Sequence, residues 1–245
     1  MKRLFLLIAF SSLVAGSNAK ETLKFCGVEW PPFTYVENNS IVAGLSYDII
    51  KEAFRRLDVD VVMDSIPWPR CESYVMNGKY DAIIDNSLIG DPFIRGQYPA
   101  TKYTLAVYVR DDFDQTRFSW ESLDGKSVGF VRGYDYTERI KKYRGWNKEL
   151  SANDERVLLK LKVKRYDYVV LDTYGAPLLA EKLNIKIRKL EPEIDSTNLY
   201  LSFNKQRTTI LKAYDEVISQ MIDDGTMDKL YLQYLPHNYS DILKK

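Results

Sequence analysis

The sequence predicts an α/β protein built from two lobes. Predicted strands alternate with amphipathic helices along most of the 245 residues, which is typical of a parallel sheet with right-handed crossovers. A polar, charged passage after residue 112 interrupts the alternation, and the pattern restarts near residue 126. Because the length alone fits one large domain or two small ones, the restart is the observation that favours two lobes.

Residues 1–19 are predicted to be a cleaved signal peptide. A basic start (MKR) precedes the apolar run LFLLIAFSSLVAG, and SNA supplies small residues for cleavage after Ala19. The apolar run is shorter than the ~20 residues that span a bilayer, and Cys26 lacks the small preceding residues of a lipoprotein site. We therefore expect an exported protein that resides in the periplasm.

The first part of the mature chain contains three predicted strands and two predicted helices. The helix over 44–58 is amphipathic, so one of its faces is expected to pack on the sheet. The strands are TLKFCGV (22–28), VDVVMDS (59–65) and YDAIIDN (80–86), and the helices are GLSYDIIKEAFRRLD (44–58) and WPRCESYVMNGK (68–79).

The remainder repeats the same alternation. Gly225 in DDGT suits a helix C-terminus and separates the last two predicted helices. The expected strands are 103–112, 126–131, 166–172, 185–190 and 198–205, and the expected helices are 135–144, 152–164, 173–183, 206–223 and 226–234.

Charge and composition exclude several classes of function. The net charge is +1 and becomes about −1 once Lys2 and Arg3 leave with the signal peptide, whereas a nucleic-acid-binding protein carries a strong basic excess. One histidine, His237, and two cysteines do not suffice for a usual zinc cage. We expect no metal, no cofactor and no nucleic-acid partner.

The two cysteines are expected to form a disulfide. An even count in an oxidising compartment favours a Cys26–Cys71 bridge over two buried free thiols.

Five segments, in order, resemble one known family. They are VEWPPFTYVENNSIVAGLSYDIIKEAFRRL, NGKYDAII, SLDGKSVGFVRG, YDYVVLD and DDGTMDKLYLQYL. Together they resemble the bacterial extracellular solute-binding proteins of family 3, the polar amino-acid type. The resemblance implies a two-lobed periplasmic-binding-protein fold (type II) that is hinged by two crossing strands. Lobe 1 would comprise 20–107 and 197–245, and lobe 2 would comprise 108–196.

In such a fold the ligand lies between the lobes, at the carboxyl ends of strands. Trp30 and Trp68 each follow a strand and match aromatic cleft positions of the family, where they would clamp a small ligand. The alternative for each is core packing. Phe33 is expected to pack under the loop, and a bridge from Cys26 to Cys71 would tie the two tryptophan loops together.

Arg95 is the candidate for binding a ligand carboxylate, because a guanidinium offers two parallel donors. The family's Thr-x-x-Arg pattern is absent here, so Arg95 is alternatively a surface arginine. Asn86 and Ser87, at the end of a strand, would add polar contacts.

The second lobe contributes a glycine turn and an acid. Arg132, Gly133 and Tyr134 occupy a strand-to-helix turn whose amides suit an anionic group, or they form an ordinary turn. Asp172 matches the family position that pairs with a ligand ammonium, and alternatively caps the following helix.

The resemblance implies capture of a small amino-acid-like solute by a monomer that serves the membrane permease of an ABC-type transporter. One alternative is a ligand-sensing adaptor for a membrane receptor. Another is a small-molecule lyase with Glu29 or Asp85 as acid or base, although the sequence offers no Ser-His-Asp or Cys-His set in this region.

Overall fold

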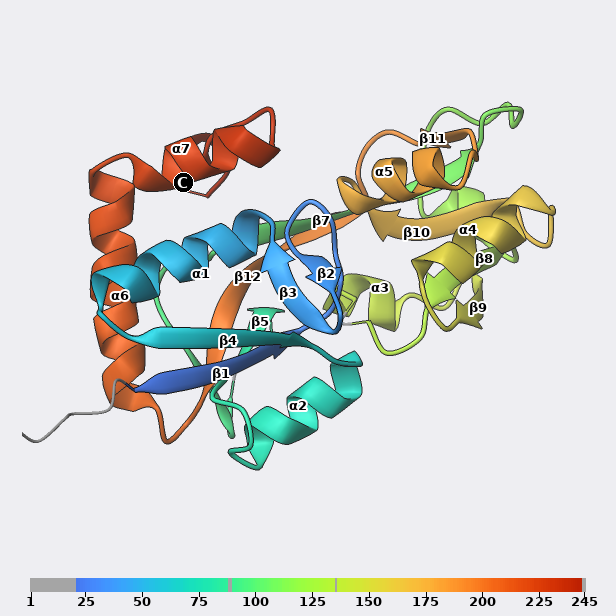
Figure 1. The fold of residues 1–245 in the computed structure, drawn as a ribbon. Helices are drawn as coiled ribbons and strands as arrows, with labels where there is room; N and C mark the ends of the chain where they lie inside the picture. Colours follow the sequence, from blue (N-terminus) through green and yellow to red (C-terminus); the bar gives the residue numbers. More distant parts are fainter. Residues whose placement is uncertain (1–20, 88–89, 135, 244–245) are drawn as a thin grey trace, which may run out of the picture.

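The computed structural model describes residues 21–87, 90–134 and 136–243. The expected signal peptide lies outside these ranges and stays a prediction. Figure 1 shows two α/β lobes joined by two long strands, β7 (Thr101–Arg110) and β12 (Asp195–Asn204). Within the described ranges, no helix is both long and apolar enough to cross a membrane.

The first lobe is built on the sheet order β2-β3-β4-β1-β5, in which β1 pairs in parallel with both β4 and β5. Helices from both ends of the chain cover this sheet, and α1 lies beside α6 and α7. The elements are β1 (Thr22–Gly27), β2 (Tyr35–Glu37), β3 (Ser40–Ala43), α1 (Leu45–Arg56), β4 (Asp60–Ser65), α2 (Trp68–Met76), β5 (Ala82–Asn86), β6 (Phe93–Arg95), α6 (Thr208–Asp223), α7 (Thr226–Tyr234) and α8 (Tyr239–Leu243).

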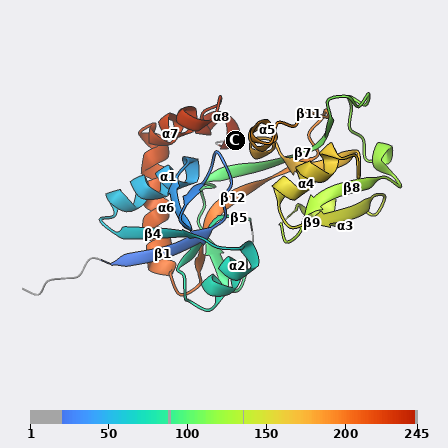
Figure 2. The ribbon, with the colours of Figure 1, turned by 45° about the vertical axis from the view of Figure 1, so that its right-hand side comes forward.

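The second lobe continues the sheet as β7-β10-β8-β9, with β10, β8 and β9 parallel to one another. Side chains of α4 and α5 pack in one core of this lobe and Ile140 of α3 packs in the other, so these helices cover opposite faces of the strands. Figure 2 gives a second view of the lobe, turned by 45°. The elements are a 3₁₀ turn (Glu121–Leu123), β8 (Ser127–Val131), α3 (Glu138–Lys142), β9 (Asn147–Ser151), α4 (Asp154–Lys162), β10 (Tyr168–Asp172), α5 (Gly175–Lys182) and β11 (Ile187–Lys189).

The two lobes are connected by the antiparallel pairing of β7 and β12. Residues 101–105 of β7 pair with residues 195–199 of β12. Beyond this pairing, β7 enters the second lobe and pairs with β10, while β12 enters the first lobe and pairs with β5. The expected pair of crossing strands is therefore present.

Each lobe has hydrophobic cores of its own. The large core of the first lobe combines α1 with side chains of α6 and α7, so the end of the chain returns to this lobe. The second lobe has one core on each face of its sheet, and Leu105, Ala106 and Val107 already belong to these cores. We propose the division into lobes that was expected from the sequence, except that the first boundary lies before Leu105 instead of after residue 107.

The largest difference from the expected elements lies at 135–144. The helix there covers only Glu138–Lys142, because Tyr143 is already extended and Trp146 turns into the core. The next five residues form β9, a polar edge strand beside β8. Its exposed residues show no apolar alternation, so the periodicity of the sequence does not reveal this strand.

The predicted disulfide between Cys26 and Cys71 is present, with 5.7 Å between the two Cα atoms. Both residues are fully buried and pack with Val75 and Ile83 in a small core of the first lobe. The bridge therefore fastens α2 to β1 one turn after Trp68.

Candidate functional site

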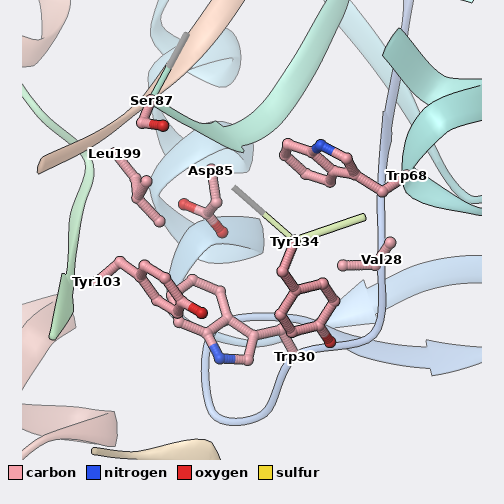
Figure 3. Close-up of a pocket in the computed structure, with 8 residues that line it drawn as sticks. All are labelled: Val28, Trp30, Trp68, Asp85, Ser87, Tyr103, Tyr134 and Leu199. Atoms are coloured by element: carbon pink, nitrogen blue, oxygen red, sulfur yellow. The ribbon is translucent and has the colours of Figure 1, made fainter. Parts of the chain in front are cut away.

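A pocket of about 500 Å³, including its open mouth, lies where the lobes meet (Figure 3). Its walls come from strand ends of the first lobe, from both crossing strands and from the turn after β8. The lining residues are Val28, Trp30, Trp68, Asp85, Ser87, Tyr103, Tyr134 and Leu199.

Trp30 is held by a tight loop. The Trp30 amide donates to the Thr34 carbonyl over 3.1 Å, and the amides of Phe33 and Thr34 both donate to the Trp30 carbonyl. Phe33 is 1% exposed, and its ring stacks under Trp30 with 4.1 Å between centroids. Phe33 thus packs under the loop as expected, and the half-buried Trp30 faces the pocket.

The same loop also contacts the second lobe. The ring of Phe33 meets Tyr174 edge-on at 5.7 Å. A β-carbon at Gly175 would lie only 3.1 Å from the Pro31 carbonyl oxygen. The loop therefore lies against the start of α5, and the lobes are in contact at this edge of the cleft.

Trp68 begins α2 and lines the opposite wall. Its indole N–H donates to Glu72 Oε1 over 2.8 Å, one turn further along the helix. This hydrogen bond fixes the ring plane, and the disulfide at Cys71 fixes the helix that carries it. Both tryptophans follow strands of the first lobe and line the same pocket, where the sequence places them.

The second lobe supplies Tyr134, which lies in the turn after β8. The Tyr134 hydroxyl donates to the carboxylate of Asp154, at the start of α4. Gly133 has φ of +81°, and a β-carbon there would lie 3.7 Å from Pro69 on α2. This turn therefore closes the cleft on the side of Trp68.

Asp85 is the charged residue of the lining, at the end of β5. It is 9% exposed and accepts hydrogen bonds from Ser46 Oγ at 2.6 Å and from Thr101 Oγ1 at 2.9 Å. Burial raises its pKa from 3.8 to about 6, and the two hydrogen bonds only partly offset this shift.

Asp172 lies at the end of β10, next to the pocket but not in its lining. Its Oδ1 accepts from the amides of Tyr174 at 3.0 Å and Gly175 at 2.6 Å, as a cap of α5 does. Burial raises the pKa of Asp172 to about 6, and hydrogen bonds from Gly175 and from the Trp30 side chain partly oppose this rise. The structure thus shows the capping contact that the sequence offers as the alternative.

The remaining predicted site residues lie outside the lining of the pocket. The Arg95 guanidinium stacks over the Tyr200 ring at 4.1 Å and donates to the Ser87 carbonyl at 3.2 Å, so its side chain is outside the lining. Asn86 is fully buried behind Ser87. Arg132 is exposed at the start of the turn that carries Tyr134, and it is also outside the lining.

Sequence reasoning missed three lining residues, and it assigned Asp85 only to a lyase. Tyr103 lies on β7 and Leu199 on β12, so both come from the crossing strands. The two expected crossing strands were the signal for these residues, because side chains of such strands that face the cleft form its floor. Val28, directly after β1, carried no comparable signal.

The raised pKa of Asp85 predicts a pH-dependent difference in stability between the wild-type protein and Asp85→Asn. A raised pKa means that the folded state holds the proton more tightly than the unfolded state does. The proton on Asp85 therefore stabilises the folded wild-type protein fully below pH 3.8, and this contribution is lost as pH rises through 6. The groups around the carboxylate are the Ser46 and Thr101 hydroxyls and the phenols of Tyr214 and Tyr231. None of these four is a cation that would offset the loss.

We therefore expect the variant to gain stability relative to the wild type between pH 4.5 and 7.5. The full pKa shift of Asp85 corresponds to at most about 3 kcal/mol. Because part of this contribution is already lost at pH 4.5, the gain between the two pH values should be about 2 kcal/mol. Urea unfolding of both proteins at the two pH values measures it, with Asp111→Asn as an exposed control of equal charge change. An identical difference at both pH values would contradict the burial of an ionised Asp85.

Comparisons with known proteins agree with this geometry. The sequence profile of the bacterial extracellular solute-binding proteins, family 3, matches residues 25–237. The L-cystine-binding protein TcyJ of Escherichia coli (strain K12) is 22% identical, over 82% of this chain and 77% of the relative.

Two solved structures are also similar. A mutant of ArgBP from T. maritima is 25% identical, with a TM-score of 0.73 over 87% of this chain and 94% of that chain. A histidine kinase sensor domain with similarity to periplasmic binding proteins is 16% identical, with a TM-score of 0.80 over 89% and 98% of the two chains, and shows a shared fold. With the family profile matching most of its length, two lobes on crossing strands and a cleft between them, the chain belongs to the bacterial extracellular solute-binding proteins, family 3.

Proposed function

We propose that this protein captures a small amino-acid-like solute in the cleft between its lobes and delivers it to an ABC-type importer. The observation that carries the proposal is the pocket where the lobes meet, lined by aromatic side chains of both lobes and of a crossing strand. Two lobes that are connected by a pair of crossing strands can open and close like a hinge around a solute.

The side chains have separate roles in this proposal. Trp30 and Trp68 of the first lobe and Tyr134 of the second enclose the solute, and Ser87 offers a polar contact. The other predicted residues are outside the lining, and in this proposal they support the residues that form it: they are Asn86, Arg95, Arg132, Gly133 and Asp172.

The location and the partner follow from the same proposal. The predicted signal peptide directs the chain to the periplasm, where the disulfide is stable. The relative TcyJ is named for binding L-cystine, which supports an amino-acid-like ligand here. We propose that the protein acts as a monomer and docks on a membrane permease.

A thermal-shift screen of the mature protein tests this function. The panel contains the twenty amino acids, L-cystine, agmatine, cadaverine, choline, histamine, succinate and citrate. A ligand that binds only the folded protein raises its melting temperature by mass action. We expect at least one amino acid or amine to do so, and incubation with that compound to leave it chemically unchanged. A panel without any shift would contradict solute capture in this cleft, and product formation would indicate an enzyme.

A further inference from the structure

The charge of the cleft is negative. Among the described residues that line the pocket, Asp85 is the one charged side chain, and no lysine or arginine shares the lining. Figure 3 shows its carboxylate between the rings of Tyr103 and Trp68. A solute in this pocket therefore meets a carboxylate and, among the described lining residues, no basic side chain.

The negative charge of Asp85 has no cationic partner among the described residues. Its hydrogen bonds come from the neutral hydroxyls of Ser46 and Thr101. A buried carboxylate is costly without a counter-ion, because hydroxyl donors stabilise the charge but do not neutralise it. The arrangement leaves room for a positive group that comes from the solute.

Two more carboxylates lie behind the wall formed by the second lobe. Asp154 accepts from the Tyr134 hydroxyl, and Asp172 accepts from two amides at the start of α5. Neither forms an ion pair with a described lysine or arginine. Three carboxylates therefore lie in the lining or directly behind it. Arg95, the arginine expected to bind a ligand carboxylate, lies behind Ser87, where its guanidinium stacks on Tyr200.

The walls of the pocket also favour a positive charge. Trp30, Trp68, Tyr103 and Tyr134 surround Asp85. The faces of these rings carry negative electrostatic potential and attract ammonium and guanidinium groups, most strongly where water is excluded. A carboxylate ligand would gain nothing from these faces and would be repelled by Asp85.

We propose that the cleft recognises an organic cation, an amine or guanidinium, whose positive group sits among the aromatic rings with Asp85 as its counter-ion. The inference rests on the proposed capture of a solute in this cleft and names the class of that solute. A free carboxylate on the solute contributes little to binding, so compounds that lack one should still bind.

Isothermal titration calorimetry on the wild-type protein at pH 7.5 tests the class. The probes are L-arginine, agmatine (arginine without its carboxylate), L-lysine, cadaverine, L-cystine and L-glutamate. Agmatine is matched with L-arginine, and cadaverine with L-lysine. In at least one of these pairs, we expect the affinity for the amine to lie within tenfold of the affinity for the amino acid. Both members of that pair should bind at least tenfold more tightly than cystine or glutamate. Tighter binding of cystine or glutamate would overturn the cation proposal but leave solute capture intact. Absence of binding by every probe would overturn the cation proposal too, and the wider thermal-shift panel would then decide on solute capture.

The role of Asp85 is tested by the tightest cationic probe of that series. Asp85→Asn keeps the shape of the side chain and removes its charge, so we expect affinity to fall at least about thirtyfold, as when a buried charge pair loses one partner. The matched control Asp111→Asn, on an exposed turn, should bind as the wild type does. Circular dichroism checks that both variants fold. An unchanged affinity in folded Asp85→Asn would overturn the assignment, and the wild-type series decides the class of solute even if the variant does not fold.

Discussion

Replacing Gly44 with alanine is expected to lower the free energy of unfolding by at least about 4 kcal/mol. Gly44 has φ of +116°, and an added β-carbon would lie 2.3 Å from the Phe33 carbonyl oxygen, which belongs to the backbone. The approach is this close because the first amides of α1, those of Leu45 and Ser46, donate to the carbonyls of Pro32 and Phe33. An alanine would force the Trp30 loop away from α1.

Urea unfolding measures this loss, and Gly78→Ala is the matched control. Gly78 also has a positive φ, of +71°, but a β-carbon there would have no atom within 4 Å. The control should therefore lose only about 1 kcal/mol, the cost of the left-handed backbone conformation itself. Equal losses in the two variants would show that contact between the loop and α1 does not matter for stability.

Replacing Trp30 with alanine is expected to weaken solute binding by about three hundredfold or more. A buried tryptophan at the centre of a binding site commonly contributes 2–4 kcal/mol, about thirtyfold to a thousandfold in affinity. Trp30 lines the pocket, stacks on Phe33 and meets Tyr103 edge-on at 5.5 Å. Its indole N–H also lies close enough to the Asp172 carboxylate of the second lobe to oppose the rise in the pKa of that group. The variant loses a wall of the pocket together with a contact between the lobes.

Calorimetric titration with agmatine measures this loss, and Trp30→Phe separates the two contributions. Phenylalanine keeps an aromatic face toward the pocket but has no N–H for Asp172, so we expect a loss of only about tenfold. Wild-type affinity in a folded Trp30→Ala protein would mean that this residue serves core packing alone.

The two-lobed fold was predictable because its signals are local and repeated. The amphipathic face of α1 and the glycine between α6 and α7 are visible in the sequence and appear in the structure. The edge strand β9 was not predictable, because its five residues are mostly exposed and gain their order from pairing with β8. Pairing of this kind depends on distant residues, which no short window of sequence contains.

For the candidate site, membership of the pocket lining was predictable where a residue follows a strand of the parallel sheet. Trp30, Trp68, Ser87 and Tyr134 all line the pocket for this reason. Arg95 was harder to place, because the direction of a long side chain depends on a partner, here the Tyr200 ring, that is distant in the sequence.

Asp85 was overlooked as a ligand contact for a related reason. The sequence places it at a strand end but does not show whether a lysine or arginine lies opposite. Among the residues that the structure describes, only the hydroxyls of Ser46 and Thr101 bond to its carboxylate. Among the described residues Asp85 has no cationic partner, which makes the cleft negative. This absence can be recognised only in the folded protein.

A crystal structure of the wild-type protein grown with agmatine would show whether Asp85 is the counter-ion of a bound cation. We expect one end of agmatine, amine or guanidinium, between Trp30 and Trp68, with a nitrogen within hydrogen-bonding distance of the Asp85 carboxylate. Agmatine bound outside this cleft, or bound in it with both charged ends away from Asp85, would contradict recognition of a cation by Asp85.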